Sequence, residues 1–274
     1  MNQQEFRDKV QLQSGPEAKE RVKIGVAECV IVMPVHNALP YVKRTVEFIK
    51  KDPYHRPLVI VDDASDAETL EYLKSVEEHD GENPGDGRFI KVLRNNRQQL
   101  FTRTVNRGLR YARKTFPATE YMIVLNSDVD LFEGWEQGLL KILKFNPNIG
   151  KVAYRDSTEP NLQDAWEEVK FPGYLTGHCF AVPTKILEEV GVLCESDVGG
   201  AECVFPELAH LKGLAHIGSD RHLTYRIQNA GYKTVYSNYP GCGHEAGKSW
   251  GHNLNWLFSF NLDPLWPAND HITS

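Results

Sequence analysis

Short apolar runs alternate with helical segments over the first half of the chain, and this alternation strongly constrains the fold. The apolar runs cover residues 29–33, 58–61, 89–93 and 121–125. Apolar residues at helical spacing follow at 39–51, 66–79 and 98–114. Strands that alternate with helices at this spacing predict right-handed crossovers and a parallel sheet. The first strand should stop at Pro34, and Asp66 is a suitable N-cap for the second helix.

The second half is less regular. We expect strands at 151–154 and 180–182, and helices at 183–190 and 220–230. There is no internal repeat, low-complexity tract or linker, so the chain should form one α/β domain with appended ends.

Composition excludes several classes of protein. The 274 residues are 41% hydrophobic and 25% charged, which is typical of a soluble globular protein, and the net charge of -6 disfavours a nucleic-acid partner. The cysteines are odd in number and form no C-x-x-C pair, which indicates reduced thiols and a cytoplasmic location. We expect no membrane insertion, because no apolar run reaches about 18 residues.

Polar residues follow three of the four predicted strands. They are Pro34 to Asn37, the pair Asp62-Asp63, and Asp128 with Asp130. In parallel α/β sheets, ligands bind at the carboxyl ends of the strands. These positions therefore predict a ligand site at one edge of the sheet.

Asp128 and Asp130 are one residue apart at the end of a buried strand. Residues i and i+2 of a strand point the same way, so both carboxylates could face one point. Two such charges repel each other, and a divalent cation with oxygen ligands, Mg²⁺ or Mn²⁺, would remove the repulsion. The alternative is a solvated turn before a helix that starts near Phe132.

The sequence lacks the usual phosphate-binding loops. There is no G-x-x-x-x-G-K-S/T segment and no G-x-G-x-x-G after the first strand. A metal and cationic side chains would then hold the phosphates of any nucleotide. Candidates on the third helix are Arg97, Arg103, Arg107 and Lys114, although each one singly is better explained as part of a solvated basic face.

Six segments together resemble glycosyltransferase family 2, over about residues 29–247. They are Val30–Asn37, Leu58–Asp66, Val105–Gly108, the D-x-D-like Leu125–Asp130, Gly177–Pro183, and Gly218–Arg226 with the following Ala230–Tyr232. The resemblance implies a GT-A fold, with a Rossmann-like, mostly parallel central sheet flanked by helices. It also implies an arm at 1–27, a catalytic domain at 28–247 and an aromatic tail at 248–274. Within the domain, 28–130 would bind the nucleotide-sugar donor and 131–247 the acceptor.

The resemblance also implies an activity of the hexosyltransferase class. A sugar would pass with inversion from a nucleotide diphosphate, most often UDP, to an acceptor hydroxyl of unknown identity. The implied donor-binding residues are Pro34, His36, Asn37, Asp62, Arg103, Arg107 and Asp128. Asp128, Asp130 and His244 would hold Mn²⁺ or Mg²⁺, and Asp220 would be the general base.

Some features depart from the family pattern. Ser219 replaces the acidic residue that commonly precedes the base, so Asp197 or Glu202 remain alternative carboxylates. The same departure leaves open a non-catalytic nucleotide- or glycan-binding module. A transferase that modifies DNA or protein is another alternative, and a sugar-nucleotide pyrophosphorylase ranks low because it needs a glycine-rich loop after the first strand. The tryptophan-containing tail could pack on the domain or on a second copy of the chain in a homodimer.

Overall fold

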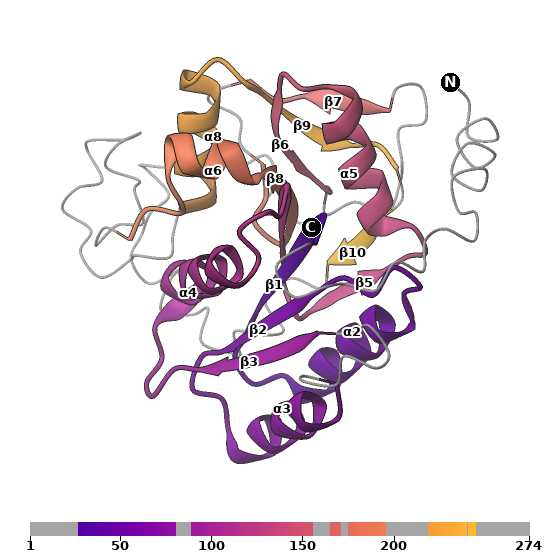
Figure 1. Cartoon of the computed structure of the whole chain (residues 1–274), viewed down its shortest axis with the longest axis vertical. Coiled ribbons are helices and arrows are strands. Elements are labelled where there is room, and N and C mark those ends of the chain that lie inside the picture. Colours follow the sequence, from indigo (N-terminus) through magenta and orange to yellow (C-terminus); the bar gives the residue numbers. More distant parts are fainter. Residues whose placement is uncertain are drawn as a thin grey trace, which may run out of the picture.

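One mixed β-sheet forms the centre of the structure, and helices cover both of its faces (Figure 1). The computed structural model describes residues 27–80, 89–155, 165–170, 175–195, 219–239 and 241–244. The sheet has eight strands in the order β3-β2-β1-β4-β8-β6-β9-β7. Their bounds are β1 Cys29–Val35, β2 Leu58–Asp62, β3 Ile90–Arg94, β4 Tyr121–Leu125, β6 Ile149–Ala153, β7 Trp166–Glu168, β8 Cys179–Pro183 and β9 Lys233–Ser237. Residues 1–26 of the predicted N-terminal arm, the aromatic tail, and the alternative carboxylates Asp197 and Glu202 lie outside the described residues.

The predicted parallel sheet is confirmed for the first half of the chain. β1 pairs in parallel with both β2 and β4, and β2 pairs in parallel with β3. β8 runs antiparallel to β4 and β6, and β7 runs antiparallel to β9. The sheet is therefore mostly parallel, and the carboxyl ends of β1, β2 and β4 meet at one edge.

The expectation that the first strand stops at Pro34 is wrong, because β1 continues to Val35. Pro34 pairs with Val61 of β2, whereas the pairing of β1 with β4 ends at Val32 and Val124. Beyond Val32, β1 has a ladder partner on one side only. A proline without an N–H group is tolerated at such a position.

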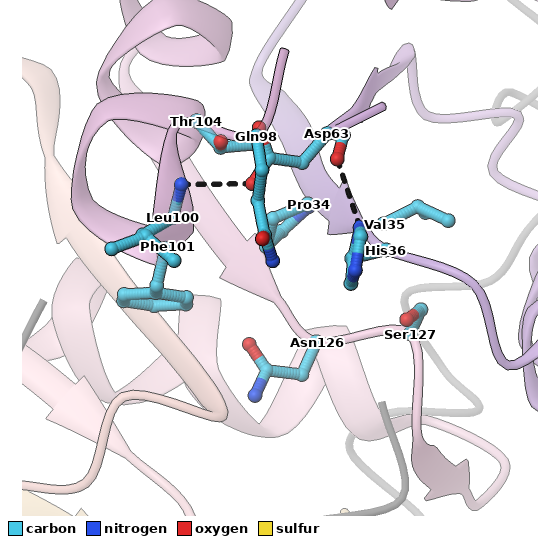
Figure 2. A pocket seen from close by; sticks show the side chains of 10 residues that line it. All are labelled: Pro34, Val35, His36, Asp63, Gln98, Leu100, Phe101, Thr104, Asn126 and Ser127. Atoms are coloured by element: carbon cyan, nitrogen blue, oxygen red, sulfur yellow. Dashed lines mark hydrogen bonds between the residues drawn. The ribbon is translucent and has the colours of Figure 1, made fainter. Parts of the chain in front are cut away.

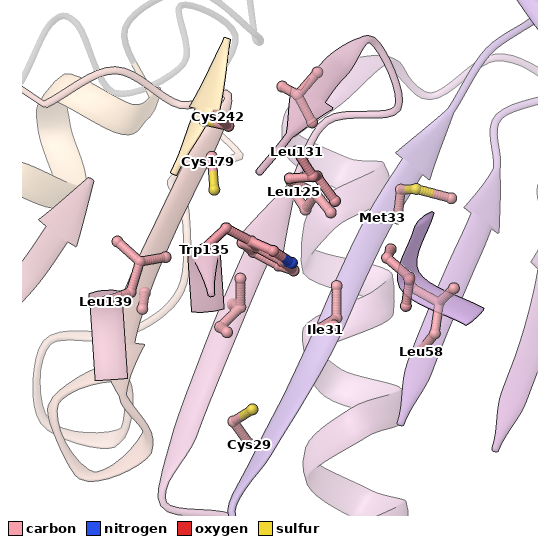
Figure 3. Close-up of a cluster of buried hydrophobic side chains, with 14 of the residues drawn as sticks. Cys29, Ile31, Met33, Leu58, Leu125, Leu131, Trp135, Leu139, Cys179 and Cys242 are labelled. Atoms are coloured by element: carbon pink, nitrogen blue, oxygen red, sulfur yellow. The ribbon is translucent and has the colours of Figure 1, made fainter. Parts of the chain in front are cut away.

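The two sides of the sheet pack against different helices. α2 (Leu39–Lys51), α3 (Ala67–Asp80) and α5 (Trp135–Phe145) cover one face, and α4 (Leu100–Thr115), α6 (Thr184–Val190) and α8 (Ser219–Asn229) cover the other. The alternation along β1 divides its side chains, with Ile31 and Met33 in the first cluster and Val32 in the second. Figure 3 shows part of the first cluster around the fully buried indole ring of Trp135.

The helices of the first half begin close to the predicted residues. Asp66 caps α3 as expected, since the backbone N–H of Thr69 donates a hydrogen bond of 2.8 Å to its carboxylate. This bond lowers the pKa of Asp66. The helix expected near Phe132 begins at Trp135 instead, because a short strand, β5 (Val129–Leu131), precedes it.

The short strands of the second half were not predicted from the sequence. β5 pairs antiparallel with β10 (Cys242–His244) in a separate two-stranded sheet, in which His244 lies opposite Val129. β7 and β9 add to the edge of the main sheet. The three-residue strands β5, β7 and β10 show too little periodicity to be recognised from sequence. Among the helices that the structure describes, none is long and apolar enough to cross a membrane.

Gly108 sets the distance between α4 and the sheet, and its replacement tests this packing. A Cβ at Gly108 would lie 2.4 Å from Val32 Cγ1 and 2.9 Å from Val61 Cγ2. The overpacking costs about 1–3 kcal/mol, which outweighs the helical preference for alanine of roughly 1 kcal/mol. We expect Gly108→Ala to lower the free energy of unfolding by about 1–2 kcal/mol in urea denaturation. Exposed Lys114 of the same helix is the control, and an equal loss in Lys114→Ala would contradict the explanation.

Candidate functional site

A pocket of about 420 Å³ lies at the carboxyl ends of β1, β2 and β4 (Figure 2). Its walls come from segments that are far apart in the sequence. They are Pro34, Val35, His36, Asp63, Gln98, Leu100, Phe101, Thr104, Asn126 and Ser127. The position is typical of a small-molecule site in a parallel α/β sheet.

The loop after β1 is tied to the loop after β2. His36 Nδ1 lies 2.8 Å from the carbonyl oxygen of Asp63, and the Asn37 side chain lies 3.3 Å from His36 Nε2. Because a carbonyl oxygen can only accept, His36 Nδ1 is the donor in the first contact, and Nε2 faces the Asn37 side chain. Asn37 also accepts a hydrogen bond from the backbone N–H of Asp66 and donates its own N–H to Ser65. Pro34 and His36 thus line the pocket, whereas Asn37 holds the two loops together.

Asp62 and Asp63 are both buried, but only Asp63 lines the pocket. The carboxylate of Asp62 accepts a hydrogen bond of 2.6 Å from Arg94 Nη1 and another of 3.0 Å from the backbone N–H of Ser65. These partners occupy both carboxylate oxygens. Asp62, the residue expected to bind the nucleotide, therefore holds the end of β3 and its own loop.

Asp63 joins three parts of the site. Its carboxylate accepts hydrogen bonds from Asn95 Nδ2 at 2.7 Å and from the backbone N–H groups of Gln99 and Leu100 at 2.7 and 2.8 Å. Its own N–H donates to the carbonyl oxygen of Val35. A carboxylate at these N–H groups also interacts favourably with the N-terminus of α4.

The backbone at Leu100 is strained, with φ of 64°. A bulky side chain in this left-handed region costs free energy, and such residues concentrate at functional sites. The hydrogen bond from Leu100 N to Asp63 holds the conformation. The same hydrogen bond holds the N-terminus of α4 at the wall of the pocket.

Asn126 and Ser127 form the wall that follows β4. The backbone N–H of Asn126 donates to the carbonyl oxygen of His178, and the hydroxyl of Thr45 in α2 donates to the carbonyl oxygen of Ser127. Within the described residues, Asn126 Oδ1 and Ser127 Oγ are buried and have no hydrogen-bond partner. Figure 2 shows the Asn126 side chain directed into the pocket. Buried polar atoms without a partner are uncommon in folded proteins, and these two lie at the wall of the pocket.

Asp128 lies next to the pocket and faces His244. The carboxylate is 1% exposed, and its Oδ1 lies 3.5 Å from His244 Nε2. The His244 ring stacks on that of His178, with centroids 4.6 Å apart and planes 6° from parallel. The pairing of β5 with β10 brings His244 close to Asp128, although the two residues are more than a hundred positions apart in the sequence.

Asp130 has a different environment from Asp128. Its side chain is 40% exposed, and its Oδ1 lies 2.8 Å from Nε of Arg44, a residue of α2. Asp128 lies in the turn before β5, so the strand alternation that predicted two parallel carboxylates does not extend to it. In the part of the chain that the structure describes, no three His, Cys, Asp or Glu side chains are arranged to bind a metal together. Any metal at this site would need ligands beyond the described side chains of this chain.

Asp220 lies in the first turn of α8, as the sequence predicts for a residue that opens a helix. Its Oδ1 accepts a hydrogen bond of 2.8 Å from the backbone N–H of Arg221. A Cβ at Gly177 would be 3.2 Å from Asp220 Oδ2, so the loop before β8 lies directly against this carboxylate. The next residue, His178, contacts both Asn126 and His244. Asp220 is thus linked through two residues to the pocket and to Asp128.

The arginines of α4 are exposed on the outer side of the site. Arg107 donates hydrogen bonds to the carbonyl oxygen of Arg94 and to the side chain of Asn95. Arg103 is exposed on the same helix. Neither arginine lines the pocket.

Several residues of the pocket were not predicted from the sequence to belong to the site. Asp63 follows the selected Asp62 directly, and strand alternation alone could not decide which of the two faces the ligand. Asn126 and Ser127 precede Asp128 at the end of a predicted strand, and this position was the signal available for them. Gln98 precedes α4, and Leu100 and Phe101 lie in its first turn, where helical periodicity alone does not identify a ligand-binding residue.

The buried carboxylate of Asp63 should be essential for the fold of the site. In Asp63→Ala, three N–H donors lose their acceptor, so we expect the free energy of unfolding to fall by about 2–4 kcal/mol in urea denaturation. Asp66, the exposed carboxylate that caps α3, provides the matched control. Asp66→Ala should cost only about 1 kcal/mol, and an equal loss in both variants would contradict the role assigned to Asp63.

Comparison with known proteins agrees with the fold. The mannosyltransferase PcManGT from Pyrobaculum calidifontis, in complex with GDP-Man and Mn²⁺, superimposes with a TM-score of 0.59 and 17% identity over 89% of this chain and 64% of that one. TarS 1–349 from S. aureus, in complex with UDP, gives a TM-score of 0.55 and 13% identity over 79% of this chain and 60% of that one. The chain thus spans less than two thirds of the length of either protein. At these identities the likeness shows a common fold.

Sequence comparison identifies the family. No curated protein matches the chain. The model of the family described as Glycosyl transferase family 2 matches residues 30–191, which is more than half of the 274 residues. The match includes β1, β2 and β4, whose ends form the pocket. The chain therefore belongs to glycosyltransferase family 2 and has the GT-A fold of its structural neighbours.

Proposed function

We propose that the protein transfers a sugar, with inversion and with the help of a divalent metal, from a nucleotide diphosphate to an acceptor hydroxyl. The observation that carries this proposal is the pocket at the ends of β1, β2 and β4, which lies next to Asp128 and is linked to Asp220. Family membership supports a glycosyltransferase. The GDP-Man and UDP complexes of the neighbours support a nucleotide donor.

The nucleoside would bind in the pocket. Pro34 and His36 form one wall, and Asp63 replaces Asp62 as the acidic residue proposed to face the nucleoside. The buried oxygen atoms Asn126 Oδ1 and Ser127 Oγ would complete their hydrogen bonds with the donor. We propose a UDP-sugar as the first donor to test and a GDP-sugar as the second.

Asp128 and His244 are the proposed ligands of Mn²⁺ or Mg²⁺. The 3.5 Å between Asp128 Oδ1 and His244 Nε2 is close to the roughly 3 Å that separates neighbouring ligands of an octahedral ion bound at about 2.1 Å. Other coordination positions would then remain for diphosphate oxygens and water. The bound ion would act as a Lewis acid toward the leaving diphosphate. Asp130 would join this set only after leaving Arg44.

Asp220 is the proposed general base. A carboxylate next to the acceptor hydroxyl takes its proton while the oxygen attacks the anomeric carbon, and the bond from that carbon to the diphosphate breaks in the same step. A single displacement inverts the anomeric centre and needs no nucleophile from the protein. Asp220 lies in the first turn of α8, where the helix dipole interacts favourably with a negative charge.

Donor and metal binding can be tested together by thermal unfolding. UDP, GDP and their sugars are added with and without Mn²⁺, and a ligand at one hundred times its Kd should stabilise the protein by about 2.7 kcal/mol. Asp128→Asn should remove the stabilisation that depends on Mn²⁺, and Asp130→Asn should retain it because Arg44 already pairs with Asp130. The reverse pattern would show that Asp130 holds the metal and Asp128 does not.

Asp220→Asn tests the chemical step. With a donor identified by the binding screen, we expect kcat to fall by about 10²- to 10⁴-fold while donor affinity changes little. The assay follows release of the nucleoside diphosphate. Wild-type protein that binds nucleotides but turns over no sugar donor would instead support a non-catalytic binding module. Unchanged kcat in the variant would rule out Asp220 as the base.

A further inference from the structure

Lys151 is a lysine in the interior of the protein. It lies in the middle of β6, and its side chain is fully buried. β6 pairs with β8 and β9, and the ammonium group faces α8, the helix that carries Asp220. A lysine is almost never buried completely unless specific partners hold it.

The ammonium group of Lys151 contacts two segments that meet at the site. Nζ lies 3.3 Å from the carbonyl oxygen of Leu175, 3.5 Å from that of Asp220 and 3.2 Å from Thr224 Oγ1. It also lies 4.4 Å from the centre of the Phe180 ring. Leu175 precedes Gly177 in the loop before β8, and Asp220 and Thr224 belong to the first turns of α8. Lys151 therefore joins the loop to the helix.

Thr224 reinforces this junction. Its hydroxyl donates a hydrogen bond of 2.8 Å to the carbonyl oxygen of Asp220, and the backbone N–H of Leu175 lies 3.5 Å from the same hydroxyl. Gly177 lies against the Asp220 carboxylate. The carbonyl oxygen of Asp220 is thus contacted by Lys151 and Thr224, while its carboxylate packs against the loop before β8.

This lysine reduces the stability of the fold. Burial lowers the pKa of Lys151 from 10.5 to about 8, and attraction to Asp220 offsets part of the effect. Because the folded-state pKa is lowered, the cost is complete below about pH 8 and shrinks as the pH rises toward 10.5. An apolar side chain of similar shape would avoid the cost, and replacement of buried ions in this way is often neutral or stabilising. Stability therefore does not explain the charge at this position.

We propose that Lys151 is a positioning residue for Asp220, whose ammonium group fixes the first turn of α8 against the loop that precedes β8. This inference rests on the proposed role of Asp220 as general base. Phe180 of β8 and Thr234 of β9 are the uncharged neighbours of Lys151 on the adjacent strands. On α8, Asp220 is the titratable group that acts on it. The positive charge thus acts mainly on the proposed base.

Lys151→Met removes the charge and keeps the length of the side chain. We expect its melting temperature to equal or exceed that of the wild type, while kcat falls about 10- to 100-fold and donor Kd changes less than about twofold. The acid side of the pH profile of kcat should also move to higher pH, because the base loses a nearby positive charge. Activity is measured with UDP-glucose and GDP-mannose in the presence of Mn²⁺.

Thr224→Val is the matched variant, because it removes hydrogen bonds at the same junction but keeps the charge of Lys151. It should lower kcat without moving the acid side of the pH profile. If Lys151→Met does not fold, a normal kcat in Thr224→Val overturns the proposal. Exposed Lys114 of α4 provides the general control, and Lys114→Met should behave as the wild type.

Hydrogen exchange tests the contact between the loop before β8 and the first turn of α8 without an activity assay. The amide groups of residues 219–224 should exchange at least about tenfold faster in Lys151→Met, whereas those of β1 and β4 should be unchanged. An active Lys151→Met with wild-type kcat and pH profile would overturn the inference and leave the proposed function intact. Wild-type protein that neither binds nor turns over any donor would refute the proposed function, and unchanged exchange at 219–224 would refute the junction itself.

Discussion

One buried carboxylate, that of Asp63, connects the parts from which the pocket is built. Its oxygens accept hydrogen bonds from Asn95, Gln99 and Leu100, and its N–H donates to Val35. These bonds join the ends of β1 and β2 to the start of α4. A charged acceptor that is shared among several N–H groups is stronger than neutral hydrogen bonds and costly to leave without donors. The position of the pocket wall, including the strained Leu100, depends on this interaction.

The acidic residues at this edge of the sheet differ in how their charge is compensated. Asp62 pairs with Arg94 at 2.6 Å and Asp130 with Arg44 at 2.8 Å, both within the range of strong ion pairs. The contact of Asp128 with His244 is longer, at 3.5 Å, and an imidazole is charged only when it is protonated. Asp128 thus lies beside an imidazole that can itself bind a metal, whereas Asp130 lies beside an arginine. This reasoning, rather than the D-x-D spacing, leads us to favour Asp128 over Asp130.

The two halves of the fold contribute differently to the proposed chemistry. The parallel half supplies the nucleotide pocket from strand ends, which are fixed by regular backbone pairing. The second half places Asp220 through side chains, with Lys151, Thr224 and Gly177 around the first turn of α8. A buried ammonium group reduces stability, and its contacts gather at the proposed base. Side chains at functional positions often lower the stability of the fold in exchange for activity.

Much of the fold could be predicted from the sequence, because periodicity and strand–helix alternation are local properties. The apolar runs at 29–33, 58–61 and 121–125 are all strands of one sheet, and a pocket lies at the edge where the strand ends predicted a ligand site. Tertiary structure decided which polar side chains share a space. It turned Asp62 toward Arg94 and Asp63 toward α4, and it brought His244 to Asp128 through the pairing of β10 with β5. Such choices depend on partners that are distant in the chain, so local sequence determines the strand ends but not what each side chain contacts there.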